Sequence, residues 1–274
     1  MNIQDLINEK EAAKAFSKQA LIFDAYDAGN TIIHYKRQRV RDHVLRYLPP
    51  QSSILELNAG TGTDAVFFAG RGHRVHATDI AEGMQTKLKE KVQQQGLTDK
   101  VTAELCSFTA LATLRHKGPY DLIFSNFAGL NCTRDLEKVL DSFGPLLKPG
   151  GQVTLVILPA FSLWETLLLF RGNFKLAFRR LFGRKKGAPA HVEGVHFRCW
   201  YHSPSFVRRT MKRNAFELLG LEGLCTIVPP SYMENFTTRF PKTYRFLCAL
   251  EDRWKDRWPW RTIGDYYIIS FRKK

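Results

Sequence analysis

The chain has 274 residues, 44% of them hydrophobic and 24% charged, so it can bury a full core and is neither disordered nor fibrous. Residues 1–18 are polar and the longest apolar run is short, which predicts no secretory signal and no membrane span. Five cysteines without a paired framework fit a reducing compartment, so we expect a cytoplasmic protein. The net charge of +15 leaves open a nucleic acid, an anionic membrane surface or a small-molecule enzyme with a basic exterior.

In chain order, helices are predicted over residues 1–48, because apolar residues recur at helical spacing before Pro49-Pro50. From residue 52 the pattern alternates between strand and helix. Strands are predicted at 53–58, 74–79, 100–106, 120–126 and 151–158, and helices at 63–71, 81–95 and 133–146. The strands are nearly continuous apolar runs, which favours a parallel sheet buried by helices on both faces.

The alternation stops after residue 158. Residues 159–202 form an aromatic, leucine-rich and basic segment with a Gly/Pro-containing turn at 183–189 and a strand-like stretch at 195–201. A helix is expected next, then two last strands with a further helix between them. The helix is predicted at 203–214, the two strands at 216–228 and 263–271, and the helix between these strands at 244–254.

The most informative motif is the turn after the first predicted strand. Ile54–Leu57 leads into Gly60-x-Gly62, and a helix follows. Glycine has no Cβ, so the backbone can lie against a ligand, and the helix N-terminus presents free N–H groups to it. Such a turn predicts a nucleotide-like cofactor. Gly60-x-Gly62-x-x-Ala65 with Asp79 as a ribose-binding acid also fits a dinucleotide, so an NAD(P)-dependent oxidoreductase remains an alternative.

Four motifs in order favour a different cofactor. They are Glu-x-Asn-x-Gly-Thr-Gly at 56–62, Ala-Thr-Asp-Ile at 77–80, Ser-Asn-Phe-x-x-Leu-Asn-Cys at 125–132 and Lys-Pro-Gly-Gly at 148–151. In this combination the chain, chiefly residues 20–158, resembles the class I S-adenosylmethionine-dependent methyltransferases.

The resemblance implies an α/β, Rossmann-like, doubly wound fold. Its seven-stranded sheet is mostly parallel and ends in an antiparallel hairpin, with a helical N-terminus and a lid insertion after the fifth strand. The chain is then a single domain, 1–274. Its parts are an N-terminal helical cap (1–50), a cofactor-binding core (51–158), a lid or substrate insertion (159–202) and a C-terminal part of the sheet with substrate-side helices (203–274).

The resemblance also implies roles at the cofactor site. Gly60 and Gly62 let the turn approach the methionine moiety, while Glu56 and Asn58 orient its ammonium group. Asp79 accepts hydrogen bonds from the ribose hydroxyls. The alternatives are an ion pair between Glu56 and a helical arginine, and a capping role for Asp79 at the next helix.

The adenine and the start of the glycine-turn helix supply further candidates. Ile80 and Met84 are implied to pack around the adenine. The aspartate that many relatives carry after the third strand is absent here, so Ser107 as a hydrogen-bond acceptor and Phe108 as a stacking ring take its place. Asp64, at the start of the helix, completes this group of cofactor-binding candidates.

The other end of the cofactor is expected to face the N-terminal helices. Tyr26 and Arg37 lie where relatives close over the cofactor carboxylate, with Arg39 as the alternative arginine. Asn126 ends the fourth strand and is the residue implied to face the methyl group. The sulfonium already activates that methyl, so a catalytic base is optional. His34 is the base candidate we retain, and the other histidines considered are His191, His196 and His202.

We expect no metal site, because His196-x-x-Cys199-x-x-His202 lies on a predicted strand where these positions do not share a face. The aromatic and basic insertion predicts a small aromatic or lipophilic acceptor, or contact with an anionic membrane surface. The substrate candidates are Trp164, Trp200, Tyr201 and Tyr232.

Ser125-Asn126-Phe127 differs from the Asn/Asp-Pro-Pro-aromatic motif of methyltransferases acting on bases and glutamines. Nothing in the sequence resembles a known RNA- or DNA-binding module, so a nucleic acid is not the expected partner. The charge nevertheless keeps an RNA methyltransferase as the main alternative within the enzyme class. A non-catalytic scaffold is disfavoured because the glycine turn and Asp79 are intact.

Overall fold

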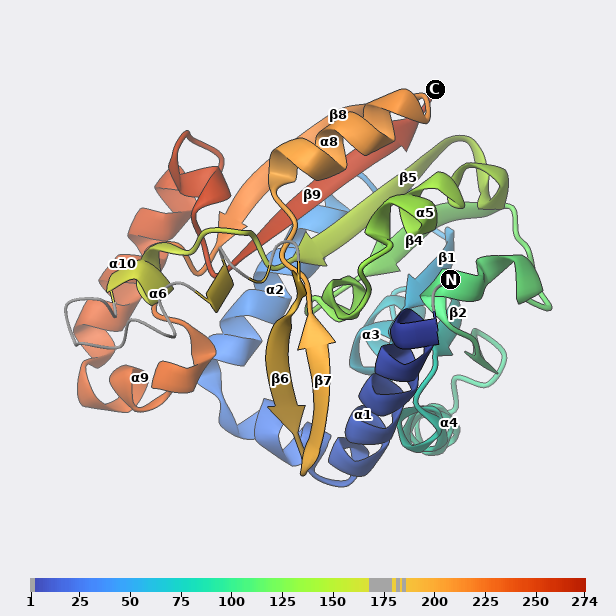
Figure 1. Cartoon of the computed structure of the whole chain (residues 1–274), viewed down its shortest axis with the longest axis horizontal. Helices are drawn as coiled ribbons and strands as arrows, with labels where there is room; N and C mark the ends of the chain where they lie inside the picture. Colours follow the sequence, from blue (N-terminus) through green and yellow to red (C-terminus); the bar gives the residue numbers. More distant parts are fainter. Residues whose placement is uncertain (1–2, 168–178, 181–182, 184–185) are drawn as a thin grey trace.

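The computed structural model describes residues 3–167, 179–180, 183 and 186–274. Seven strands form one sheet in the order β3-β2-β1-β4-β5-β9-β8 (Figure 1). The first five run parallel, and β9 is antiparallel to both β5 and β8. Their bounds are β1 Ser53–Leu57, β2 Arg74–Asp79, β3 Val101–Leu105, β4 Tyr120–Ser125, β5 Leu147–Ile157, β8 Phe216–Leu224 and β9 Tyr266–Lys273. The Rossmann-like fold and its antiparallel last strands are therefore confirmed.

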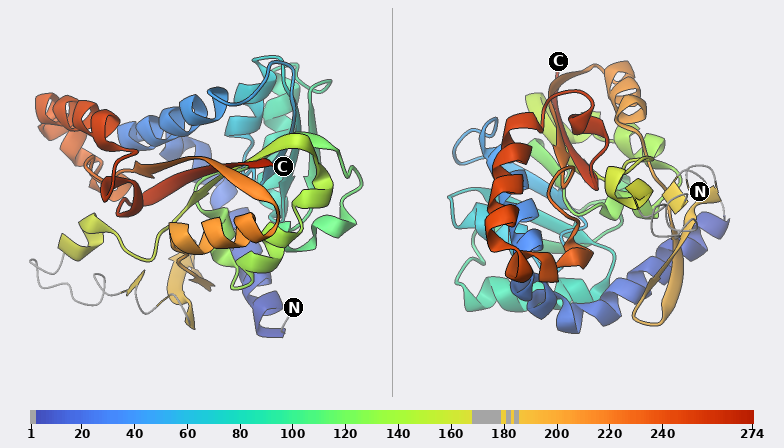
Figure 2. Two further views of the ribbon diagram at one scale, coloured as in Figure 1. Left: turned by 90° about the horizontal axis from the view of Figure 1, so that it is seen from above. Right: turned by 90° about the vertical axis from the view of Figure 1, so that its left-hand side faces the viewer.

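The central strands are apolar throughout because both faces of the sheet are covered. Neighbouring residues of β1 point to opposite faces, so Leu55 and Leu57 join one hydrophobic cluster and Ile54 joins the other. Helices α5 (Leu136–Asp141) and α8 (Pro204–Arg213) cover the first face. Helices α2 (Thr31–Leu45), α3 (Thr63–Ala69) and α4 (Glu82–Gln94) cover the second, as the layers in Figure 2 show.

Strand order reverses between β1 and β4, because β2 and β3 lie on one side of β1 while β4 and β5 lie on the other. In open α/β sheets, ligands bind outside the carboxyl ends of the strands at such a point. The fold thus places the glycine turn after β1 and the Asn126 segment after β4 at one edge.

Helix α1 (Ile3–Gly29) and a two-stranded hairpin, β6 (Ala188–Val192) with β7 (Val195–Cys199), lie side by side in front of this edge (Figure 1). Ala12 and Ala15 of α1 pack against Val195 and Phe197 of β7. The short alanine side chains let the helix approach the hairpin closely. The strand expected near 195–201 is present, whereas β6 was not expected from the sequence.

Two further differences concern element lengths. The helix expected at 133–146 is shorter, because α5 ends at Asp141 and a separate turn with Pro145 follows at Gly144–Leu146. The expected helix at 244–254 is the end of α10 (Pro241–Trp254). Helices α6 (Leu163–Leu167) and α9 (Asn235–Arg239) are short. Most of the aromatic, basic part of the insertion (168–178, 181–182 and 184–185) lies outside the described residues.

No helix within residues 3–167 or 186–274 is both long and apolar enough to cross a membrane.

Candidate active site

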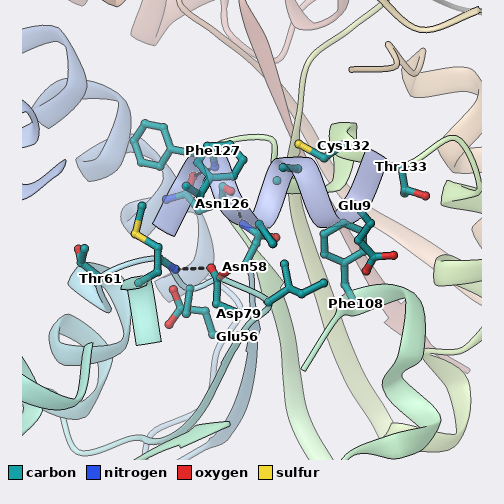
Figure 3. A pocket seen from close by; sticks show the side chains of 18 of the residues that line it. Glu9, Glu56, Asn58, Thr61, Asp79, Phe108, Asn126, Phe127, Cys132 and Thr133 are labelled. Carbon is teal, nitrogen blue, oxygen red and sulfur yellow. Dashed lines mark hydrogen bonds between the residues drawn. The ribbon is translucent and has the colours of Figure 1, made fainter. Parts of the chain in front are cut away.

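A cavity with an empty volume of about 1020 Å³, including its open mouth, lies at the carboxyl ends of β1, β2 and β4 (Figure 3). Helix α1 forms one wall, and the other walls come from the glycine turn, the segment after β4 and the end of β7. The expected residues that line it are Arg37, Glu56, Asn58, Gly60, Asp64, Asp79, Ile80, Met84, Phe108, Asn126 and Trp200.

The glycine turn has the backbone that its sequence requires. Gly60 and Gly62 have φ of 57° and 78°, in the left-handed region that disfavours a side chain. A Cβ on Gly62 would stand 2.7 Å from Cγ of Leu88, so this glycine is also needed for packing of α4 under the turn. Gly62 itself does not line the cavity but shapes the residues that do.

Asp79 ties the turn to the next strand. Its carboxylate accepts hydrogen bonds from the N–H of Gly60 at 2.9 Å and the N–H of Ala81 at 2.8 Å. Burial raises the pKa of Asp79, and these backbone donors oppose the rise. The alternative of a helix cap is wrong, because the N-cap residue of α4 is Ala81 and Asp79 accepts a hydrogen bond from its N–H while lining the cavity.

Glu56, at the end of β1, is almost fully buried, and its Oε2 has no hydrogen-bond partner. Burial raises the pKa of Glu56 well above its ordinary value, and the nearby charge of Asp64 adds to the effect. No ion pair joins Glu56 to an arginine among the described residues. A buried carboxyl oxygen without a partner beside a cavity is suited to a cationic ligand group.

Arg37 also lines the cavity and holds two carboxylates, Asp64 at 2.6 Å and Asp27 at 2.9 Å. Its Nε is buried without a partner and is therefore suited to an anionic ligand group. Burial raises the pKa of Asp64, but the arginines outweigh it and the pKa is lowered overall. Asn126 donates to the same Asp64 oxygen at 2.8 Å, so Asp64 positions its neighbours with both of its oxygens occupied.

Arg39, the alternative arginine, points elsewhere. It forms ion pairs with Glu222, Glu251 and Asp252 and does not line the cavity. Between the two arginines, the structure thus brings Arg37 to the cavity.

Several expected residues lie away from the cavity. Tyr26 is 53% exposed on α1, and His34 is exposed on α2 with its Nε2 near the carbonyl oxygen of Ala28. We therefore withdraw Tyr26 as a carboxylate contact and His34 as a base. Ser107 caps a short helix and donates its hydroxyl hydrogen bond to Glu9, so its side chain does not face an adenine freely.

The remaining substrate candidates divide in the same way. Trp200 lines the cavity, whereas Trp164, Tyr201 and Tyr232 do not. Tyr201 is buried against Arg180 of the insertion, and Tyr232 is 56% exposed.

The other histidines are also outside. His191 and His196 face each other across the β6–β7 hairpin. Burial lowers the pKa of His202 to about 4, so its imidazole is neutral at physiological pH. No three His, Cys, Asp or Glu side chains in the described part of the chain are placed to hold a metal ion.

Helix α1 supplies cavity residues that no motif indicated. They are Asp5, Asn8, Glu9, Ala12, Ala13, Phe16 and Phe23. Asn8 fixes the helix by donating to the carbonyl oxygens of Cys132 and Arg198 and accepting from the N–H of Arg198 at 2.6 Å. In the sequence, the alanine-rich face of α1 indicates that this helix packs closely against another element, but it does not indicate which element that is.

Comparisons with known proteins agree with this geometry. A family model described as a methyltransferase domain matches residues 54–151. The tRNA 5-carboxymethoxyuridine methyltransferase of Escherichia coli (strain K12) is 25% identical over 233 residues, which cover 85% of this chain and 84% of that protein.

Solved methyltransferase structures share the fold. Geranyl diphosphate C-methyltransferase from Streptomyces coelicolor A3(2) superposes with a TM-score of 0.58 at 15% identity, covering 88% of this chain and 81% of that one. The 1,6-didemethyltoxoflavin-N1-methyltransferase of Burkholderia thailandensis gives 0.58 at 14% identity, covering 97% and 88%.

The partnerless atoms of Glu56 and Arg37, the glycine turn and Asp79 fit the amino-acid and ribose parts of S-adenosylmethionine. S-adenosylmethionine is the cofactor, and the NAD(P)-dependent alternative is set aside. The protein is an enzyme, and the chain belongs to the class I S-adenosylmethionine-dependent methyltransferases.

Proposed function

We propose that the protein transfers the methyl group of S-adenosylmethionine to a small aromatic or lipophilic acceptor. The observation that carries this proposal is the lining of the cavity, which holds four aromatic side chains besides Phe108, the ring assigned below to the adenine: Phe16, Phe23, Phe127 and Trp200. Aromatic walls favour flat or apolar ligands, and a few polar groups fix their orientation. An acceptor oxygen, nitrogen or carbon atom remains equally compatible with these walls.

The cofactor supplies an activated methyl group on its sulfonium, and the residues of the chain bind and orient it. We assign Glu56 to the ammonium, the Nε of Arg37 to the carboxylate and Asp79 to the ribose. Glu56 and Arg37 each carry the charge opposite to that of the ligand group assigned to them, and the Asp79 carboxylate is a strong acceptor for the neutral ribose hydroxyls.

The adenine would lie between Phe108 and the side chains of Ile80 and Met84, all of which line the cavity. Asn126, held by Asp64, is assigned to the methyl end. Helix α1 and the hairpin cover the cavity and exclude water, so the cap at 1–50 and the insertion at 159–202 act together on the core at 51–158. Residues 203–274 complete the sheet.

A second candidate is methylation of RNA, with a base inserted into the same cavity. Two observations favour it: the Escherichia coli relative is named a tRNA methyltransferase, and the net charge of +15 suits phosphate contacts. An anionic membrane surface as a partner has no support in the described residues, and the basic part of the insertion on which it depends is outside them.

Methyl-labelled S-adenosylmethionine separates the two candidates. The purified enzyme is incubated with total tRNA and, separately, with an organic extract of cells that has been treated with ribonuclease. Label in the organic extract supports the small-molecule proposal. Label confined to tRNA, with binding that weakens steeply as salt rises, would replace it by the RNA candidate. Absence of S-adenosylhomocysteine binding in a parallel calorimetric titration would count against both.

A further inference from the structure

Helix α1 brings a carboxylate to the end of the cavity that is assigned to the adenine. Glu9, in the first half of α1, lines the cavity and is only 9% exposed. Its carboxylate accepts a hydrogen bond from the hydroxyl of Ser107 and another, at 2.9 Å, from the hydroxyl of Thr109. These two residues flank Phe108, the ring assigned to the adenine. Figure 3 shows Glu9 and Phe108 at the same end of the cavity.

The surrounding contacts fix the position of this carboxylate. Ser107 Oγ accepts a hydrogen bond from the N–H of Thr109 at 3.0 Å, and its own hydrogen is donated to Glu9. On the α1 side, the neighbouring Asn8 donates to the carbonyl oxygens of Cys132 and Arg198, which ties this turn of the helix to the rest of the cavity wall. Glu9 is therefore held in place before any ligand binds.

Glu9 keeps acceptor capacity for a ligand. A carboxylate has about four lone-pair sites, and two hydroxyl groups cannot occupy all of them. Thr109 contacts both oxygens, Oε1 at 2.9 Å and Oε2 at 3.1 Å, so Oε2 receives a hydrogen bond from this one group only. Within the described part of the chain no lysine, arginine or histidine pairs with Glu9. A nearly buried carboxylate of this kind at a cavity wall is suited to a ligand group that donates hydrogen bonds.

The other carboxylates that line the cavity have different positions. Glu56 and Asp79 lie at the ends of β1 and β2, and Asp64 is held by Arg37, Arg41 and Asn126. Asp5 is on α1, one turn before Glu9. Among the carboxylates of the described residues that line the cavity, Glu9 is the one bonded to both neighbours of Phe108.

The chemistry of the purine edge identifies the ligand group. Adenine carries an amino group, which donates hydrogen bonds, whereas hypoxanthine has at the same position a carbonyl oxygen, which only accepts them. We propose that Glu9 accepts a hydrogen bond from the adenine amino group of the cofactor and makes the site selective for adenine over a purine with a carbonyl there. The N-terminal cap then takes part in recognising the cofactor as well as in covering it. This inference rests on the adenine placement of the proposed function and adds a binding residue to it.

The test uses the full-length enzyme and two ligands, S-adenosylhomocysteine and S-inosylhomocysteine, in which a carbonyl replaces the amino group. Calorimetry measures both dissociation constants. We expect the wild type to bind S-adenosylhomocysteine at least about tenfold more tightly, because S-inosylhomocysteine loses a charge-assisted hydrogen bond and turns a carbonyl oxygen toward a carboxylate.

Glu9→Gln should remove most of this preference. The amide oxygen can still accept from Ser107 and Thr109, while the amide NH₂ can donate to the carbonyl of hypoxanthine. S-inosylhomocysteine should therefore bind the variant more tightly than it binds the wild type. A Glu9 that only holds α1 against Ser107 would, when changed, weaken both ligands by the same factor and leave their ratio unchanged.

Two variants on the same helix serve as controls. Glu11→Gln removes the same charge from a residue that does not line the cavity, and it should keep the wild-type ratio. Asp5→Asn tests the neighbouring cavity carboxylate and should keep the ratio as well. The ratio of the wild type needs no variant, so it tests the inference even if Glu9→Gln folds poorly.

The inference is overturned if the wild type binds the two ligands equally, if the ratio survives in Glu9→Gln, or if it is lost in Asp5→Asn instead. Failure of the wild type to bind S-adenosylhomocysteine at all would instead overturn the proposed function. The two failures are therefore distinguishable in one set of titrations.

Discussion

The substitution Glu56→Gln tests the charge matching on which the cofactor assignment depends. The substitution keeps the shape of the side chain and removes its negative charge. One carboxyl oxygen, Oε2, is buried without a partner, so one charge-assisted hydrogen bond to the cofactor ammonium is at stake. Such a bond is worth about 1.5–3 kcal/mol, which corresponds to a loss of roughly 10- to 150-fold in affinity for S-adenosylhomocysteine.

The raised pKa of Glu56 adds a dependence on pH. In the free protein burial favours the protonated form, whereas the bound ammonium favours the carboxylate. Binding must therefore release a proton, and affinity must rise with pH until the pKa of the free protein is passed. The Glu56→Gln variant has no such proton and its affinity should lack this dependence.

The stability of the free protein should change in the opposite direction. Because the native state holds the Glu56 proton more tightly than the unfolded chain, its contribution to stability falls as pH rises above the unfolded-state pKa of about 4.3. Glu56→Gln should remove this fall, so the variant should be more stable than the wild type at neutral pH when no ligand is present.

The experiment is a calorimetric titration with S-adenosylhomocysteine in phosphate and in Tris, repeated at several values between about pH 6 and 8. The two buffers differ in their heat of ionisation, so the difference between the measured binding enthalpies gives the number of protons released. Glu90→Gln, which changes an exposed glutamate of α4, is the matched control and should bind as the wild type does. Unchanged affinity in Glu56→Gln, or binding of the wild type without proton release, would refute this reasoning.

Three further predictions concern the turn and the core beneath it. Asp79→Ala removes the acceptor of the turn N–H and should weaken S-adenosylhomocysteine binding by more than about tenfold; calorimetry giving an unchanged Kd would contradict the ribose assignment. Gly72, like Gly62, has a positive φ (90°), but a Cβ added to Gly72 would meet no atom within 4 Å. In urea unfolding, Gly72→Ala should therefore lower the free energy of unfolding by about 1–2 kcal/mol, and Gly62→Ala should lower it clearly more. Equal losses of stability in the two variants would argue against the contact between Gly62 and Leu88. Burial raises the pKa of Glu222, but hydrogen bonds and charges from His43 and two arginines outweigh it and hold the pKa well below its ordinary value. Glu222→Gln should lower the free energy of unfolding by about 3–5 kcal/mol at pH 7. In the wild type the stabilisation by Glu222 is complete above its unfolded-state pKa of about 4.3 and is lost as pH falls below it. The difference in stability between the two proteins should therefore shrink in acid. A difference that is the same at pH 7 and in acid would contradict this assignment.

The sequence by itself predicted the sheet and most of the cofactor turn, since both depend on local rules. Apolar runs predict strands that are buried on both faces, and Ile54–Leu57 and the following glycines have the backbone that their composition requires. Residues at strand ends, such as Glu56 and Asp79, reach the cavity because the carboxyl ends of parallel strands meet at one edge.

Only the tertiary structure decided which residues of the helices take part. Consecutive side chains on a helix are rotated by about 100°, so Arg37 and Arg39 point to nearly opposite sides of α2. Which of them meets the cavity depends on how α2 packs on the sheet, and the local sequence does not contain that information. For the same reason, the sequence could not show that Tyr26 of α1 and His34 of α2 point to solvent rather than into the cavity.

The contribution of α1 was hidden for a related reason. Asn8 bonds to residues more than 120 positions away, and Glu9 accepts a hydrogen bond from Ser107, 98 positions away. Such pairs follow from packing between distant segments rather than from spacing along the chain. Glu9 is the clearest case, because in the sequence it is one of several charged residues on a polar helix and only its burial at the cavity, against Ser107, distinguishes it.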